Sequence, residues 1–172
     1  MAAPQFVAKL NEQLGYEFGA HQQYVAIAAY YDALTMPQMA ALFYQQALEE
    51  RDHAMMMVQY LIDADERAVT PGVAAPQVDF GDIVSPVALA QEKRVTDQIN
   101  ALAALARSEG DYSSEQFMQW FIKEQVEEVA TMSDLLAVVT RNLDDIEDIE
   151  EYVAREQKSG ESDPTAPRIA GA

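Results

Sequence analysis

The chain has 172 residues, 49% of them hydrophobic, which suits one domain with a substantial core. Its 11 Lys and Arg residues oppose 29 Asp and Glu residues, and the net charge of -18 repels nucleic-acid phosphates and anionic lipid headgroups while attracting cations. The absence of cysteine excludes disulfides, thiolate metal sites and thiol catalysis, so a bound metal would have oxygen and imidazole ligands.

Residues 1–4 lack the basic and apolar stretches of a signal peptide, and no window approaches ~18 uncharged apolar residues, so we expect a cytoplasmic protein that binds no membrane.

The N-terminal half contains two long helical patterns. From Gln5 to about Leu34, apolar residues recur mostly at helical spacing. Pro37 ends this pattern, because proline disfavours helical geometry in the residue before it and suits the first turn of a helix. A second helix is predicted from about Gln38 to Asp65.

A long connection is predicted from Glu66 to Pro86. This stretch contains three prolines and two glycines, so it cannot continue as a regular helix. Antiparallel helices usually need only ~2–8 residues between them. About twenty extended residues at ~3.3 Å each can instead cover the ~40 Å length of a helix of about 27 residues. We therefore expect a crossover that travels the length of the bundle.

The C-terminal half contains two further long patterns and a short one. A third helix fits Val87 to about Ser108, and Asp111 or Ser113 would cap a fourth helix that runs to about Asn142. A short, highly acidic fifth helix follows, with the apolar stripe Ile146, Ile149 and Val153. Beyond 157 no helical pattern remains. The predicted architecture is all-α: a four-helix domain over 1–157, with a long crossover and a short fifth helix, and a flexible tail over 158–172.

Several acidic residues fall on the apolar faces of the first two helices. Glu17 and Tyr24 lie two turns apart on one face of the first helix. Glu50 and His53 form a Glu-x-x-His motif, whose side chains can converge on one metal ion. An unpaired buried carboxylate costs several kcal/mol, a cost that a cation removes.

The third and fourth helices repeat this feature. Glu92 lies three residues from Leu89 and from Val95, and Gln125 and Glu128 have the same i, i+3 spacing. Each helix thus supplies an inward carboxylate, as two cations at the bundle centre would need. Hard oxygen donors with one imidazole and open positions suit iron and its reaction with O₂. Tyr24 lies where it would donate a hydrogen bond or an electron.

The spacing of these motifs resembles the ferritin family over residues 5–156. Glu17-x6-Tyr24 and the run Glu49-Glu50-Arg51-Asp52-His53 resemble the ferroxidase segment of the first two ferritin helices. Gln119-Trp120-Phe121 with Glu124-Gln125-Val126-Glu127-Glu128 resembles the fourth helix of bacterial non-haem ferritins. The long crossover is the connectivity expected of a ferritin-like four-helix bundle.

The resemblance implies a specific set of iron ligands. One iron would be held by Glu17, Glu50 and His53, and the other by Glu50, Glu92 and Glu128, with Gln125 beside the pair. Glu49, Glu124 and Glu127 match a third iron site. Arg51 stands where bacterioferritins carry a haem-ligating Met, so no haem is expected. Resemblance also implies a homo-oligomeric cage of 24 subunits.

Structural readings compete for several residues. His21, one turn after Glu17, is more simply a packed or supporting histidine than a ligand, and Tyr24 is equally well explained as a core tyrosine bonded to a carboxylate. Met55, Met56 and Met57 suit packing. Glu49, Glu124 and Glu127 are equally explained as surface acids. Trp120 suits packing, or would be an oxidation target near the irons. Around the third-to-fourth helix junction, acidic capping explains Glu109, Asp111 and Glu115 as well as an entry pore does.

Three functions follow from this reading. The leading hypothesis is a ferroxidase that oxidises Fe(II) with O₂ or peroxide at a two-iron centre, detoxifies iron and stores it as a ferric mineral. The second is a small di-iron peroxidase or oxygenase on the same bundle. The third is a helical interaction module whose acidic residues only keep it in solution.

Overall fold

Within the residues described, the chain forms five helices and no strand. The computed structural model describes residues 2–84, 86–156 and 163–172, and for 86–90 it describes the backbone alone. The helices are α1 (Pro4–Ala33), α2 (Pro37–Asp63), α3 (Pro86–Ser108), α4 (Tyr112–Arg141) and α5 (Ile146–Glu156). The all-α fold predicted from the sequence is confirmed. Three helices begin one residue earlier than predicted, at a proline, because its fixed φ suits the first turn.

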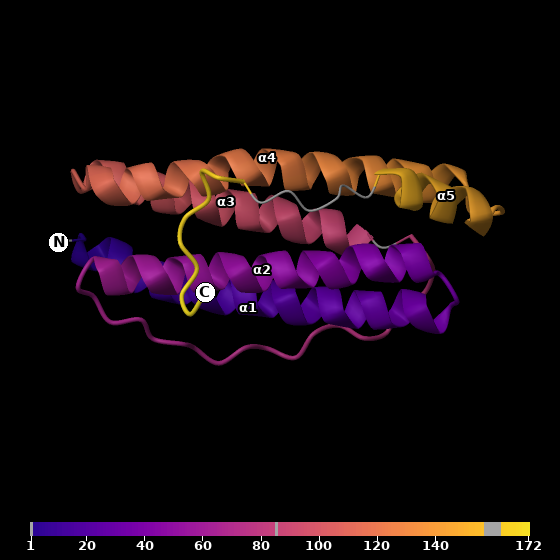
Figure 1. Cartoon of the computed structure of the whole chain (residues 1–172), viewed down its shortest axis with the longest axis horizontal. Helices are drawn as coiled ribbons and strands as arrows, with labels where there is room; N and C mark the ends of the chain where they lie inside the picture. Colours follow the sequence, from indigo (N-terminus) through magenta and orange to yellow (C-terminus); the bar gives the residue numbers. More distant parts are fainter. Residues whose placement is uncertain (1, 85, 157–162) are drawn as a thin grey trace.

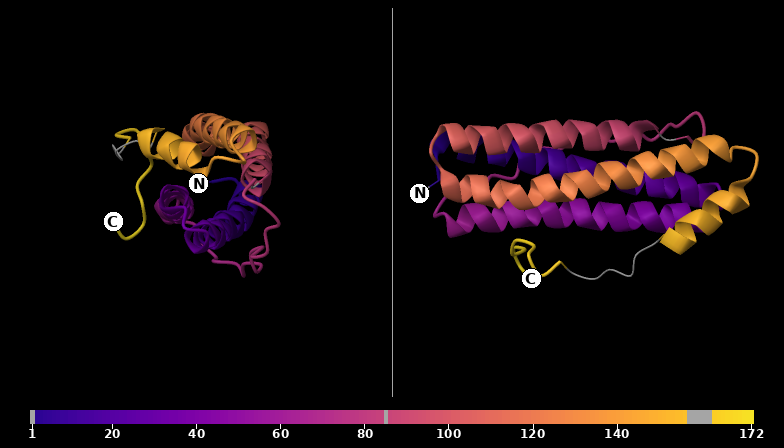
Figure 2. Two further views of the ribbon diagram at one scale, coloured as in Figure 1. Left: turned by 90° about the vertical axis from the view of Figure 1, so that its right-hand side faces the viewer. Right: turned by 90° about the horizontal axis from the view of Figure 1, so that it is seen from above.

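Two helical hairpins make the bundle. Figure 1 shows α1 beside α2 and α3 beside α4, with the crossover along one side from one end of the bundle to the other. The end-on view in Figure 2 shows the four long helices around one axis, and α5 folded back against them. No helix of the part described is long and apolar enough to cross a membrane.

Side-chain hydrogen bonds hold the crossover to α1. Asn11 accepts from the Val69 backbone N–H at 2.6 Å, and its amide donates to the Arg67 carbonyl at 3.2 Å. Gln23 makes a matching pair of bonds with the backbone of Gln77, at 2.9 and 3.0 Å. Between these two points the crossover approaches α1 at Gly15, where an added Cβ would lie 2.7 Å from Pro71 Cγ.

Two apolar clusters fill the bundle on either side of a polar layer. The first includes Tyr31, Phe43 and Val139, and the second includes Phe6, Met57 and Ile99. Ile149 and Val153 of α5 are buried in the first cluster, which confirms two members of the predicted stripe; Ile146 is exposed. The polar layer between the clusters contains the candidate metal residues.

The acidic helix α5 also supplies a cap for the N-terminus of α2. Met36, at the N-cap position of α2, makes no side-chain capping bond. Glu150 of α5 accepts from the backbone N–H groups of Gln38 and Met39, at 2.8 and 3.0 Å. A carboxylate at this position satisfies free N–H donors and opposes the positive end of the helix dipole. At least one acidic residue of α5 therefore has a structural role.

The C-terminal residues 163–172 lie across α2 and α4 (Figure 1). Asp163 accepts from Trp120 Nε1 at 3.1 Å, Arg168 pairs with Asp63 at 2.6 Å, and the Ala170 N–H donates to the Met55 carbonyl at 3.2 Å. As its composition predicted, this segment contains no helix. The predicted boundary at 157–158 lies outside the described residues.

Replacing Gly15 tests how closely the crossover and α1 must fit. We expect Gly15→Ala to be less stable than Gly19→Ala, because its Cβ would meet the rigid Pro71 ring, and overpacking of this kind costs about 1–3 kcal/mol while both variants gain the same helix propensity. Gly19→Ala is the matched control: its Cβ would lie 3.7 Å from Val73, an ordinary contact, and helix propensity favours alanine by about 1 kcal/mol. Chemical denaturation of both variants measures the difference; equal stabilities would contradict the close fit.

Candidate metal centre

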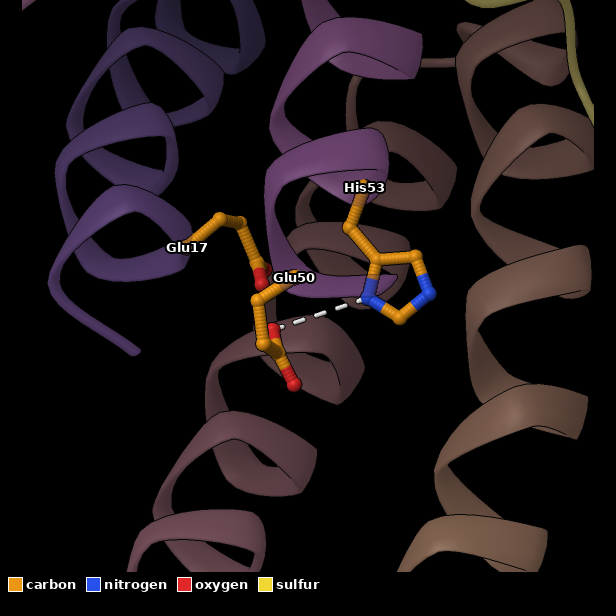
Figure 3. Close-up of side chains that lie close together, drawn as sticks. All are labelled: Glu17, Glu50 and His53. Carbon is orange, nitrogen blue, oxygen red and sulfur yellow. Dashed lines mark ion pairs between the residues drawn. The ribbon is translucent and has the colours of Figure 1, made fainter. Parts of the chain in front are cut away.

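Six polar side chains from all four long helices meet at the middle of the bundle. Little of any of them is exposed: 0% for Glu50 and Glu92, 1% for Glu17, 4% for His53 and Gln125, and 5% for Glu128. Figure 3 shows the carboxyl groups of Glu17 and Glu50 close together, with the His53 ring beside them. His53 Nδ1 lies 3.6 Å from Glu50 Oε2, and its Nε2 lies 4.0 Å from Glu128 Oε1.

These side chains form two overlapping groups. Ligand atoms of Glu17, Glu50 and His53 all lie within 4.8 Å of one another, and so do those of Glu50, Glu92 and Glu128. Glu50 belongs to both groups and would bridge two ions. The structure thus brings together the residues that the sequence proposed for each iron; their role as ligands stays a prediction.

Five of the eight carboxylate oxygens of the centre lack a hydrogen-bond donor. Both Glu50 oxygens and one oxygen each of Glu17, Glu92 and Glu128 are buried without a hydrogen-bond partner. Leaving a buried charge unpaired costs several kcal/mol, and close like charges add to that cost. A pair of divalent cations would satisfy all five oxygens. The donor set of carboxylates with one imidazole fits iron.

The same crowding shifts the pKa values of the acids. Burial, followed by repulsion from Glu17 and Glu92, raises the pKa of Glu50 well above its usual value. Burial also raises the pKa values of Glu92 and Glu128. Burial lowers the pKa of His53, but the carboxylates around it, led by Glu128, together raise the pKa by more than burial lowers it. The net change of the His53 pKa is therefore upward. Without metal, these groups therefore keep their protons to higher pH than the free side chains do, and a bound cation would displace those protons.

Uncharged residues orient the acids. The Tyr24 hydroxyl donates to Glu92 Oε1, and burial, more than the nearby Glu92 carboxylate, raises the Tyr24 pKa well above 10.0. Gln13 Nε2 donates to Glu17 Oε1 at 2.8 Å. The Gln125 amide donates to Glu128 Oε2, and its oxygen accepts from Thr96 Oγ1 at 2.9 Å.

Sequence reasoning missed two of these residues, Gln13 and Thr96. Gln13 precedes Glu17 by four residues and Thr96 follows Glu92 by four, so i, i+4 spacing placed both on the inward face. That spacing was the available signal. The contact between Thr96 and Gln125, however, joins two different helices.

The third predicted group is arranged differently. Among the residues described, Glu124 groups with His53 and Glu128 rather than with Glu49 and Glu127. Glu49 accepts hydrogen bonds from its helix neighbours Gln45 and Gln46. Glu127 is exposed. Glu124 is thus the member of the predicted trio that groups with ligand candidates of the central layer.

Several residues for which the sequence left both a structural and a functional interpretation open make packing or capping contacts. His21 Nδ1 lies 2.6 Å from the Ala47 carbonyl oxygen, a bond between α1 and α2. Met56 and Met57 are buried in the second apolar cluster, whereas Met55 is only partly buried. Asp111 caps α4 by accepting from the Ser114 N–H at 3.1 Å.

Two further acids lie at the α3–α4 junction, and the tryptophan lies beside the metal centre. Glu115 pairs with Arg107, and Glu109 is exposed at the same junction of α3 and α4. The Trp120 ring lies edge-on to His53, with 5.7 Å between ring centroids. The Phe121 ring lies at the same distance from His53, so in the part of the chain that the structure describes Trp120 is one of two aromatic neighbours of this candidate ligand.

Comparison with known proteins points to one family. The ferritin family model, described as a ferritin-like domain, matches residues 7–142. Ferritin BfrB of Mycolicibacterium smegmatis is 51% identical over 168 residues, covering 96% of this chain and 93% of that protein. A bacterial non-heme ferritin of Staphylococcus epidermidis is 37% identical over 147 residues, covering 84% and 89%. An open pore ferritin from Archaeoglobus fulgidus has the same fold, with a TM-score of 0.86 and 24% identity over 90% of this chain and 97% of its own.

The raised pKa values predict how the metal-free protein responds to pH. Glu50, Glu92 and Glu128 hold protons more tightly when folded, so their contribution to stability is complete below the ordinary glutamate pKa of 4.5 and is lost as pH rises through the raised folded values. The raised pKa of His53 acts in the same direction above 6.5. We expect the free energy of unfolding of metal-free protein to fall from about pH 5 to pH 8.

Glu50→Gln should change this response. A neutral amide stays uncharged in the core without having to bind a proton on folding, so the variant should gain about 1–3 kcal/mol at neutral pH and show a flatter pH dependence. Glu12→Gln, at an exposed position, is the control. Urea titrations at fixed protein concentration measure both; a Glu50 variant less stable than wild type at neutral pH would contradict the assigned repulsion.

Proposed function

This chain belongs to the ferritin family, and from that membership we propose that it oxidises Fe(II) at a two-iron centre within each subunit and stores the ferric product as a mineral inside a cage of its own subunits. One observation carries the proposal: four carboxylates from four helices are buried together with five oxygens that have no donor. Relatives named ferritin support iron as the cation.

Two overlapping groups of residues would each hold one of the two substrate Fe(II) ions. Glu17, Glu50 and His53 would hold one Fe(II), and Glu50, Glu92 and Glu128 the other. Four carboxylates balance the charge of two divalent ions, and binding would displace the protons that Glu50, Glu92 and Glu128 retain through their raised pKa values. Each Fe(II) gives up one electron, and the two electrons, together with two protons, reduce O₂ to hydrogen peroxide or reduce hydrogen peroxide to two water molecules. The protein supplies position and charge neutralisation for this transfer.

Neighbouring residues would keep the ligands in place and lead iron away. Tyr24, Gln13 and Gln125 each donate to a carboxylate of the centre, which leaves the remaining oxygens for metal. Glu124, beside His53 and Glu128, would receive ferric iron first. Its grouping with Glu49 and Glu127 in a third site rests on the family resemblance alone.

The cage and the absence of haem belong to the same proposal. We propose 24 subunits in a homo-oligomer, as the family implies, and a cytoplasmic location. Arg51 makes an ion pair with the adjacent Asp52 at 2.6 Å, and a charged side chain at this position would not ligate haem. The rival reading as an interaction module conflicts with the burial of the acids, which cannot assist solubility from the interior.

Removing the bridging carboxylate tests the centre. We expect Glu50→Ala to slow the fast phase of Fe(II) oxidation about 10–100-fold or more, since both ions would lose a ligand. Stopped-flow ferric absorbance at about two Fe(II) per subunit measures the rate. Glu12→Ala removes an exposed carboxylate of α1 that pairs with Lys9 and should leave the rate unchanged. Equal rates for both variants would refute the site.

Iron loading separates storage from a di-iron enzyme. Purified metal-free protein is loaded with Fe(II) without oxygen and then exposed to air, and the size and iron content of the recovered particle are measured. We expect a large shell that retains many more irons than its paired sites can hold. Particles that retain only about two irons per subunit would indicate a di-iron peroxidase or oxygenase instead.

A further inference from the structure

A line of aromatic rings leads from the metal centre toward the α3–α4 end of the bundle. Trp120 lies edge-on to His53, with 5.7 Å between centroids, and 5.0 Å from Phe121. Phe121 lies 5.2 Å from Phe117, which stacks on Tyr60 at 4.1 Å with an interplanar angle of 16°. All these separations are those of rings in direct contact. A continuous π-contact path therefore joins a candidate ligand to the hydroxyl-bearing ring of Tyr60.

The Tyr60 hydroxyl has a defined path for its proton. Tyr60 Oη lies 2.8 Å from Ser114 Oγ, which lies 2.6 Å from Asp111 Oδ2. Burial raises the pKa of Asp111, but hydrogen bonds from Ser114 and Ala3 lower it more, so this group is an ionised acceptor. Because Asp111 can only accept, Ser114 donates to it, and the single hydroxyl proton of Ser114 is then used. Ser114 must therefore accept from Tyr60.

Other tyrosines of the core have different partners. Tyr30 and Tyr31 donate to the backbone carbonyls of Asp82 and Ile83, at 2.9 and 2.8 Å, and a carbonyl is too weak a base to take a proton. Tyr24 donates to Glu92, inside the metal centre itself. Tyr60 combines a carboxylate-terminated path with a partly exposed position away from the ligands. Packing explains Phe117 and Phe121, but it does not require a buried serine that links a phenol to an aspartate.

We propose that Trp120 and Tyr60 form an electron relay that reduces one-electron oxidants arising at the metal centre, and so protects its ligands. This inference rests on the proposed ferroxidase function, which supplies Fe(II) and peroxide together. Their reaction gives Fe(III), hydroxide and a hydroxyl radical.

Each step of the relay is balanced. The hydroxyl radical takes one electron from Trp120 and becomes hydroxide, leaving a tryptophan cation radical. Tyr60 donates one electron to the oxidised Trp120. At the same time the phenol proton of Tyr60 passes to Ser114, and the hydroxyl proton of Ser114 passes to Asp111. The products are hydroxide, a tyrosyl radical at Tyr60 and a protonated Asp111. Tyrosine that loses its proton on oxidation is a better electron donor than tryptophan at neutral pH, which sets the direction.

The relay can be tested without iron because the chain has one tryptophan. Pulse radiolysis with azide radicals oxidises Trp120 in the full-length, metal-free protein, and the tryptophan radical absorption should decay as a tyrosyl absorption grows. Tyr60→Phe keeps the stacked ring but should lose this growth, and Ser114→Ala should slow it. Tyr112→Phe, at a residue 74% exposed on the same helix as Trp120, is the control and should behave as wild type. Undiminished tyrosyl growth in Tyr60→Phe would overturn the relay.

A second measurement uses the iron-loaded protein. After Fe(II) and hydrogen peroxide are added, peptide mass spectrometry should find more oxidised Trp120 in Tyr60→Phe than in wild type or Tyr112→Phe. Equal Trp120 oxidation in all three would overturn the protective role. If wild-type protein oxidises no Fe(II), the ferroxidase proposal fails, and with it the protective role; electron transfer between the two residues is decided by the metal-free experiment.

Discussion

The burial of four glutamates at one level of the bundle is the constraint on which the other features depend. Each comes from a different long helix, and together they expose almost no surface. A lone carboxylate in an apolar core would be excluded by its desolvation cost, and four close together add mutual repulsion. The four charged carboxylates therefore destabilise the folded state unless cations or protons neutralise them. The polar layer divides the apolar core into two clusters, which supply the stabilisation that the layer lacks.

Ligands from four helices also require that the helices keep their positions along the bundle axis. The crossover contributes through bonds from Asn11 and Gln23 and through its close approach at Gly15. At the far end, Glu150 of α5 caps α2. A shift of one helix turn, about 5.4 Å, would separate ligand atoms that now lie within 4.8 Å. The contacts of the crossover and of α5 therefore help to hold the helices at the positions that bring the ligand atoms together.

Oxidation chemistry inside a protein core also creates a hazard for that core. Trp120 lies against His53, and Met57 is buried in the adjoining apolar cluster; both are oxidisable. The aromatic path to Tyr60 gives an oxidising equivalent a route away from the ligands. The C-terminal segment meets this path at Trp120, because Asp163 accepts from its indole N–H. The tail and the relay therefore share one residue.

The sequence by itself determined the helices, the crossover and the inward residues, because helical periodicity, proline positions and i, i+3 spacing are local properties of the chain. The pairing of Glu50 with His53 follows from their spacing alone. Only the tertiary structure decided which residues of different helices meet, as Thr96 and Gln125 do, and that Glu124 lies with His53 rather than Glu49. It likewise decided where residues 163–172 lie. Such contacts depend on how helices pack side by side, which spacing along one chain does not specify.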